Sequence, residues 1–159
     1  MIDTAEFTEQ LADVGPILGE AMIAEAEDRE AWQVVLEAAQ ITIEPDHDRD
    51  CLVFSSDLGS PPADKRDALY AFALKVNGMW PFTGGIYLGL DSESEEVTLY
   101  SVLPVNGLDS QRLAAMIVDF AERRVAWAGV VAQGGPSEGN DLPEGAVDEA
   151  LETRNIIRG

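Results

Sequence analysis

Two alternating apolar segments in the middle of the chain predict a β-hairpin with one buried face. Thr83–Asp91 and Val97–Pro104 place apolar side chains on every second residue, and the polar segment 92–96 connects them. The shared face consists of Ile86, Leu88 and Leu90 in the first strand and Val97, Leu99 and Leu103 in the second. This face needs a cover.

A long amphipathic helix follows the hairpin and is the expected cover. Its apolar residues recur at the three- and four-residue spacing of one helix face. They are Leu113, Met116, Ile117, Phe120, Trp127 and Val131. Hairpin and helix together form a surface for contact and carry no evident chemistry.

The start of the chain predicts another amphipathic helix, with Thr4 as its N-cap. Its apolar stripe consists of Phe7, Leu11, Val14 and Leu18. Because proline removes a backbone donor and crowds the preceding turn, Gly15-Pro16 predicts a break near Gly15.

Three short strands are predicted next, at Trp32–Glu37, Ile41–Glu44 and Cys51–Ser56. The first is also compatible with a helix, since a run this short does not separate the two periods. The turn-forming segment 45–50 joins the last two strands. Ser60-Pro-Pro62 ends the group, because two prolines cannot continue a central strand.

A second long helix is predicted at Ala63–Trp80, and it is apolar on more than one face. One stripe holds Leu69, Phe72, Val76 and Met79, and an adjoining one holds Tyr70 and Leu74. A second stripe indicates contact with another copy of the chain. A wide stripe buried wholly within one subunit is the alternative.

The net charge of −20, from 30 acidic and 10 basic residues, argues against nucleic acid and anionic membrane partners. Residues 1–60 contain 15 acidic side chains, and only Arg29 and Arg49 are basic there. A basic or polar polypeptide would be attracted to this half. Solubility alone also explains the acidity.

The length of 159 residues suits one folded domain, expected at residues 1–132, followed by an acidic and flexible tail at 133–159. The single cysteine, Cys51, forms no internal disulfide, and no signal-peptide or membrane-spanning pattern is evident. We therefore expect a cytoplasmic protein.

We find no argued active site, and we expect no enzyme activity, no cofactor and no metal. His47 lies among carboxylates at 46–50, but Cys51 stands where a calcium loop requires glycine, which favours a solvated turn. Local negative charge should raise the pKa of Cys51 and make it an unreactive core residue.

Other catalytic or ligand-binding patterns are also incomplete. The only histidine lies in a surface turn, so a serine triad lacks its base. Gly84, Gly85 and Gly89 are not followed by a helix N-terminus and a Lys-Ser or Lys-Thr pair, so they do not form a phosphate loop. We expect these three glycines to allow a neighbouring backbone segment to approach closely.

The order and spacing of these segments resemble the class I type III secretion chaperone family, the group that includes the Tir chaperone. The likeness covers residues 4–131. It is carried by Trp32–Leu36, Ile41–Glu44, Cys51–Gly59, Ala68–Asn77, Thr83–Asp91, Leu103-Pro104, Leu108-Asp109 and Trp127. Gly15-Pro16, Asn77-Gly78 and the tail depart from the family's pattern.

The resemblance implies an α+β fold, with the order helix, three strands, helix, two strands, helix and an antiparallel sheet packed by helices. It also implies a cytoplasmic homodimer that holds the amino-terminal region of a secreted effector in extended form. Candidates for effector contact, each also compatible with the core, are Phe7, Leu11, Leu18, Ile43, Leu52 and Phe54. Candidates for the dimer interface are Tyr70, Leu74, Ile86, Leu88 and Leu90.

Two other functions remain open at this point. One is a small α+β domain or enzyme that binds a ligand or a cation through its acidic cluster. The other is an acidic decoy that occupies a basic nucleic-acid-binding protein, which the charge alone suggests. The tail, with its few apolar residues, could also cover the groove for the effector.

Overall fold

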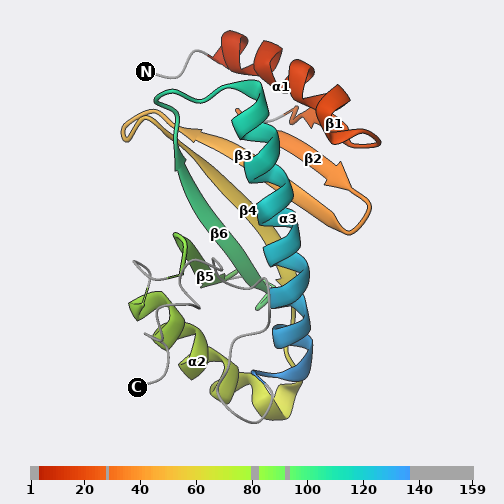
Figure 1. Ribbon diagram of the computed structural model, residues 1–159. Helices are drawn as coiled ribbons and strands as arrows, with labels where there is room; N and C mark the ends of the chain where they lie inside the picture. Colours follow the sequence, from red (N-terminus) through yellow and green to blue (C-terminus); the bar gives the residue numbers. More distant parts are fainter. Residues whose placement is uncertain (1–3, 28, 80–82, 92–93, 137–159) are drawn as a thin grey trace, which may run out of the picture. The chain divides into compact units, whose positions relative to one another are not determined.

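The computed structural model describes residues 4–27, 29–79, 83–91 and 94–136 of the chain (Figure 1). The elements, in chain order, are α1 (Thr4–Leu18), β1 (Met22–Glu25), β2 (Trp32–Leu36), β3 (Ala39–Asp46), β4 (Cys51–Gly59), the 3-10 helix η1 (Ala63–Lys65), α2 (Arg66–Gly78), β5 (Ile86–Leu90), β6 (Val97–Pro104) and α3 (Ser110–Gln133). The strand order in the sheet is β1-β2-β3-β4-β6-β5. The α+β class is confirmed. Of the predicted tail at 133–159, residues 137–159 lie outside the described residues.

The first group of strands contains four members, because β1 precedes the three that the sequence predicted. β1 pairs antiparallel with β2, from Met22 opposite Val35 to Glu25 opposite Trp32. A four-residue strand with mostly exposed side chains has no alternating pattern of its own. Its pairing with β2 makes it a strand. The segment 32–36, which was also compatible with a helix, is a strand for the same reason.

The chain divides into two compact units. Unit 1 comprises the described residues up to Ser56 and Ser101–Ala121, and unit 2 comprises the described residues from Asp57 to Tyr100 and from Glu122 onward. β4, β6 and α3 each contribute residues to both units. We describe each unit by itself.

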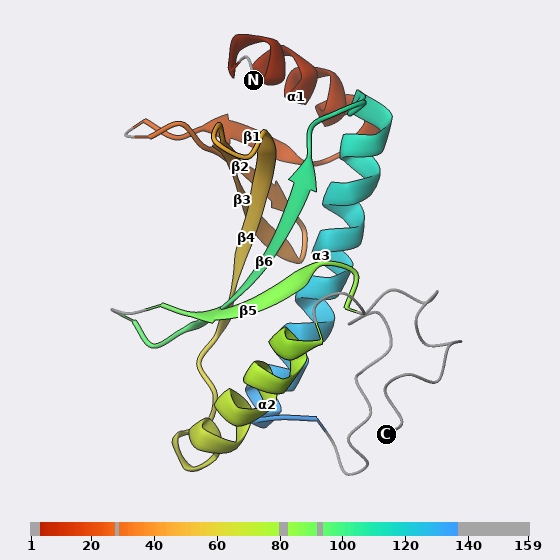
Figure 2. The same cartoon turned by 90° about the vertical axis from the view of Figure 1, so that its left-hand side faces the viewer.

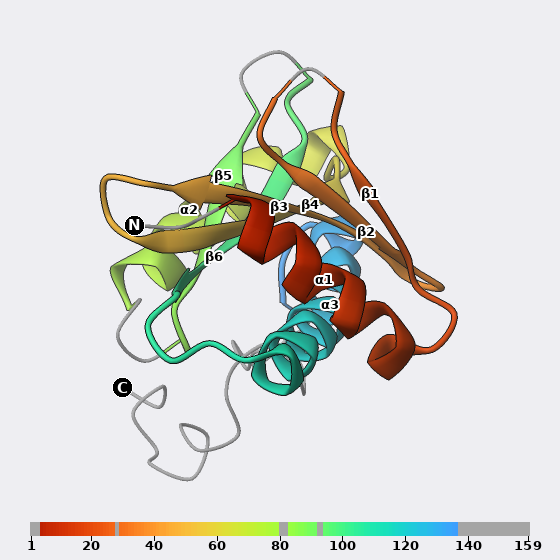
Figure 3. The ribbon, with the colours of Figure 1, turned by 90° about the horizontal axis from the view of Figure 1, so that it is seen from above.

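The core of unit 1 lies between one face of β2–β4 and two helices. The strand register places Trp32, Ile43 and Phe54 side by side across β2, β3 and β4. Phe7 of α1 packs edge-on against Trp32, with ring centroids 4.7 Å apart, and Phe120 of α3 contacts Phe54 at 5.7 Å. α1 and the first half of α3 therefore cover the same face of these strands (Figure 3).

Helix α1 runs unbroken from Thr4 to Leu18, so the predicted break near Gly15 is wrong. Pro16 lies two residues before the end of the helix, so the helix does not have to continue far beyond the lost hydrogen bond and the crowded turn. Gly19, with φ of +76°, then ends the helix in the left-handed conformation that glycine adopts readily. The N-cap prediction also fails, since Thr4 is the first helical residue and its hydroxyl donates to Glu30.

Unit 2 is built from the end of β4, η1, α2, β5, the first half of β6 and the second half of α3. Leu69 and Val76 of α2 are buried, and Phe72 packs against Trp127 of α3 with ring centroids 6.2 Å apart. Figure 2 shows α2 and β5 together in this unit. Leu90 departs from the predicted buried face, because it is the last residue of β5 and is 51% exposed.

Two glycines of unit 2 make room for side chains, whereas the sequence predicted close approach of backbone. A Cβ atom on Gly89 would lie 2.7 Å from the Tyr100 ring, and one on Gly84 would lie 2.6 Å from the Arg123 guanidinium. Gly84 also has φ of +67°, so the turn before β5 requires glycine there for a second reason.

Candidate functional site

The residues predicted to contact an effector belong mostly to the core of unit 1. Phe7, Leu11, Ile43, Leu52 and Phe54 are buried, and Leu18 is half-buried at the end of α1. Ile43 and Phe54 are register partners, so the fold does bring part of this set together. Their side chains hold the unit together, and their contact with an effector remains a prediction.

The opposite face of the same strands carries an exposed apolar pair that the sequence did not single out. Met22 is 65% exposed and Val35 is 36% exposed. The two residues lie directly opposite each other on β1 and β2. Because successive side chains alternate between the two faces of a strand, the burial of Val34 against the core directs Val35 outward.

Small or uncharged polar side chains surround this pair. Ala24 and Gln33 face each other across β1 and β2, and Gln40 lies opposite Val35 on β3. Gln40 donates to the Gln33 side chain, which donates in turn to Thr42 Oγ1 at 3.3 Å. We call the surface formed by Met22, Ala24, Gln33, Val35 and Gln40 the β1–β2 outer face. It offers both apolar contact and neutral hydrogen-bonding groups.

The β1–β2 outer face ends at an edge of the sheet. β1 stands last in the strand order, and β2 is its one strand partner among the described residues. An edge strand presents backbone N–H and C=O groups that an extended polypeptide can pair with. This edge and the apolar pair beside it together form the candidate site.

The surroundings of the site are acidic. Glu20, Glu25, Glu27 and Glu37 are all exposed on or next to β1 and β2. Arg29, the basic residue of this region, forms an ion pair with Glu44 at 3.1 Å. The surface therefore favours a partner with basic side chains.

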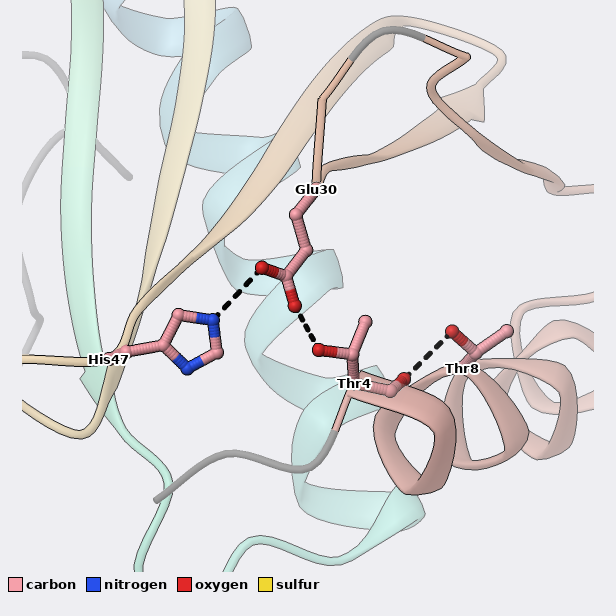
Figure 4. A network of polar contacts seen from close by, with 4 residues as sticks. All are labelled: Thr4, Thr8, Glu30 and His47. Atoms are coloured by element: carbon pink, nitrogen blue, oxygen red, sulfur yellow. Dashed lines mark hydrogen bonds and ion pairs between the residues drawn. The ribbon is translucent and has the colours of Figure 1, made fainter.

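A polar network joins three segments of unit 1 beside this region (Figure 4). His47 Nε2 lies 2.9 Å from Glu30 Oε2, and the Thr4 hydroxyl donates to Glu30 Oε1. Thr8 Oγ1 donates to the Thr4 carbonyl and accepts from Trp32 Nε1 at 3.2 Å. The network connects the start of α1, the β1–β2 connection and the β3–β4 turn, which contains His47.

The Thr4 hydroxyl and then His47 hold the pKa of Glu30 below its ordinary value of 4.5. A carboxyl group whose pKa is lowered by folding stabilises the protein above its ordinary pKa. That contribution is lost as the pH falls through the lowered value. The network therefore stabilises unit 1 at neutral pH and weakens in acid.

We expect Glu30→Gln to remove a pH-dependent part of the stability of unit 1. The urea midpoint of the wild type should exceed that of the variant at about pH 6, and the difference should shrink as the pH falls below the ordinary pKa of 4.5 and through the lowered pKa of Glu30. Thr4→Val, which removes the hydroxyl donor, should give a smaller difference with the same pH dependence. A difference between wild type and Glu30→Gln that does not change with pH would contradict the assigned role.

Cys51 and the β3–β4 turn serve structure. Burial raises the pKa of the Cys51 thiol, and the Asp46 carboxylate raises it further, so the predicted direction is confirmed, with burial as the larger cause. Asp46 accepts from the Arg49 backbone N–H at 3.0 Å and from Arg49 Nη1 at 2.9 Å, which closes the turn. The described residues contain no cluster of three His, Cys, Asp or Glu side chains able to hold a metal ion.

The dimer-interface candidates divide into exposed and buried residues. In unit 2, Leu74 is 73% exposed on α2 and Leu90 is exposed at the end of β5, while Tyr70 is half-buried. Ile86 and Leu88 are buried within the unit. Leu74 and Leu90 therefore have free apolar surface for a second copy, and the interface itself remains a prediction.

Sequence reasoning missed Met22 and Val35 because it did not recognise β1. The run Met22-Ile23-Ala24, followed by the charged segment 27–30 and then β2, is typical of a hairpin. That signal would have placed the pair on adjacent strands. Among the described residues, no helix combines the length and apolar character that crossing a bilayer requires.

Residues 21–128 match the model of the family described as the Tir chaperone protein (CesT) family. The match covers more than half of the chain and includes β1–β6 and most of α3. A comparison with curated proteins finds no match.

Solved structures of protein complexes share this fold. The ExsC–ExsE complex aligns with a TM-score of 0.66 at 16% identity, over 83% of this chain and 98% of the other. The HopA1–SchA chaperone–effector complex aligns with a TM-score of 0.62 at 20% identity, over 81% and 99%. The Yersinia pestis type III secretion chaperone SycH, solved with a fragment of YscM2, aligns at 0.56 and 22% identity, over 75% and 97%.

Proposed function

Because the chain belongs to the Tir chaperone protein (CesT) family, we propose that it is a type III secretion chaperone that holds an extended segment of a secreted effector in the bacterial cytoplasm before export. It makes and breaks no covalent bond. The proposal is supported by family membership and by a fold shared with chaperones solved as complexes.

The observation that carries the proposal for this chain is the exposed Met22–Val35 pair beside the open edge of β1. An extended polypeptide that adds a strand to an edge gains main-chain hydrogen bonds. Its alternate side chains face the same side of the sheet as the apolar pair. The edge would supply affinity for any extended segment, and the pair would select segments with apolar residues on every second position.

The acidic surroundings add a long-range attraction. Glu20, Glu25, Glu27 and Glu37 would draw a basic segment toward β1 and raise its association rate. Apolar burial would then hold the complex. This division predicts an association rate that falls with salt and a dissociation rate that changes little.

We further propose that two copies associate through unit 2, with Tyr70 and Leu74 of α2 and Leu90 of β5 in the contact. Tyr70 and Leu74 are four residues apart on the helix, so they are neighbours on its surface. A hydrophobic side chain as exposed as that of Leu74 is a candidate for burial against a partner. Ile86 and Leu88 would support this contact from within the unit.

The test of effector binding compares two variants of unit 1. The probe is the purified amino-terminal segment of the protein that copurifies with the chain from its native cells, and binding is measured by calorimetry. We expect the double variant Met22→Asp, Val35→Asp to bind about 100-fold more weakly, because it places charge where two apolar side chains are buried.

Val118→Asp is the matched control, since Val118 is also apolar and exposed in unit 1 but lies on α3. It should bind like the wild type. Equal affinity of the double variant and the wild type would contradict the proposed site. An affinity that falls steeply with salt through faster dissociation would favour the acidic-decoy alternative.

A further inference from the structure

The side chain of Asn77 makes two hydrogen bonds to the backbone of β5. Leu88 N donates to Asn77 Oδ1 at 2.8 Å, and Asn77 Nδ2 donates to the Leu88 carbonyl at 2.7 Å. One side-chain amide therefore satisfies the donor and the acceptor of the same residue, as a neighbouring strand would. Both residues belong to unit 2.

These bonds lie on the outward edge of β5. A backbone N–H has one hydrogen, so the Leu88 N–H that donates to Asn77 is not donated to β6. β5 stands last in the strand order, with β6 as its neighbour, so the side of Leu88 turned from β6 is the edge of the sheet. Asn77 occupies that edge.

A second side chain occupies the same edge two residues earlier. Residues two apart in a strand direct their backbone groups the same way, so Ile86 also faces outward. The Thr83 hydroxyl donates to the Ile86 carbonyl at 3.2 Å, and Thr83 is itself buried. Two successive outward positions of β5 are thus engaged by side chains of the chain itself.

The hydrogen bonds to β5 explain why an asparagine stands inside helix α2. Asparagine is unfavourable within a helix because its amide competes for backbone hydrogen bonds, yet Asn77 lies in the last turn of α2. The end of α2 lies beside β5, and the Asn77 amide forms its hydrogen bonds with the backbone of that strand. Asparagine at position 77 therefore stabilises the edge strand β5 and not the helix that contains it.

We propose that Asn77 and Thr83 close the outward edge of β5 to strand pairing at Leu88 and Ile86, so that strand addition is confined to β1. Unprotected edges pair with one another, and proteins block them to prevent association. The closure of β5 needs no effector. Only its consequence, that the effector adds at β1, rests on the proposed function.

The same closure bears on the proposed dimer. Pairing of two β5 strands edge to edge would require the Leu88 N–H that Asn77 already engages. A dimer contact through unit 2 is therefore made by side chains such as Leu74 and Leu90, and the two sheets do not become continuous through this edge.

The test compares Asn77→Ala with the wild type in the absence of any effector. We expect the Leu88 amide to be protected from hydrogen exchange in the wild type and to exchange about tenfold faster in Asn77→Ala. With the edge open, sedimentation velocity should show larger assemblies of Asn77→Ala that grow with concentration, while the wild type keeps one size. Asn106→Ala, at an exposed loop asparagine, should behave as the wild type.

Asn77→Asp is the second test variant, for the case that circular dichroism shows Asn77→Ala to be unfolded. Its carboxylate keeps the acceptor for the Leu88 N–H but sets an oxygen against the Leu88 carbonyl, where Asn77 Nδ2 donated. Leu88 protection should therefore fall between that of the wild type and that of Asn77→Ala, and the charge should repel a further strand. Unchanged Leu88 exchange in Asn77→Ala would overturn the proposal, as would faster exchange without any assembly. Assembly of Asn77→Asp to the extent expected for Asn77→Ala would also overturn it. None of these outcomes depends on effector binding.

Discussion

Replacing Trp32 by alanine should lower the free energy of unfolding by about 3–5 kcal/mol, the cost of emptying a large aromatic site in a packed core. Trp32 is almost fully buried and packs edge-on against Phe7. Its indole N–H donates to Thr8, so the variant also removes a bond between the sheet and α1. Urea denaturation followed by circular dichroism measures the loss.

Trp32→Phe separates the two contributions. It keeps a ring against Phe7 and removes the indole N–H, so we expect a loss of about 1–2 kcal/mol from the missing hydrogen bond and the smaller ring. A Trp32→Ala variant as stable as the wild type, but deficient in effector binding, would instead place Trp32 on the binding surface. That result would contradict the core that we describe for unit 1.

Replacing Leu74 by aspartate should convert the proposed dimer into a monomer. The twofold contact would contain two copies of the substitution, and each would lose apolar burial and place a charge in the interface. Together these changes should weaken association at least about 100-fold. Light scattering at micromolar concentration should report twice the chain mass of 17.2 kDa for the wild type and a single chain mass for Leu74→Asp.

The control for this variant is Val125→Asp. Val125 is an exposed apolar residue of unit 2 on α3, outside the contact that we propose. It should leave the mass unchanged. Circular dichroism should show that Leu74→Asp keeps its fold, because Leu74 is mostly exposed in the single chain. A wild type that sediments as a monomer at all concentrations would contradict the proposed interface.

Much of the fold followed from local patterns. The helical spacing of Leu113, Ile117 and Phe120 identified α3, and all three residues are buried. The alternation in β5 and β6 identified the hairpin, since residues on one face of a strand share one environment. Family membership could likewise be read from the order of segments.

The candidate site was predicted less well from the sequence than the fold. Phe7, Ile43 and Phe54 were predicted for effector contact, but apolar periodicity shows only that a face is covered, and in this chain α1 and α3 cover it. Met22 and Val35 were missed because a short edge strand is defined by its neighbour. Their exposure depends on which face of the hairpin the helices occupy.

The sequence by itself determined the α+β class, the family, the acidic character and most helices and strands, because these depend on local period and composition. Only the tertiary structure decided that Met22–Glu25 is a strand, that five of the six effector candidates lie in the core, and that Asn77 serves β5. The reason is that contacts between different elements, such as the hydrogen bonds between Asn77 of α2 and Leu88 of β5, leave no period in the sequence. Asn77-Gly78, which by itself reads as the weak end of a helix, becomes the closure of a sheet edge only when β5 lies beside it.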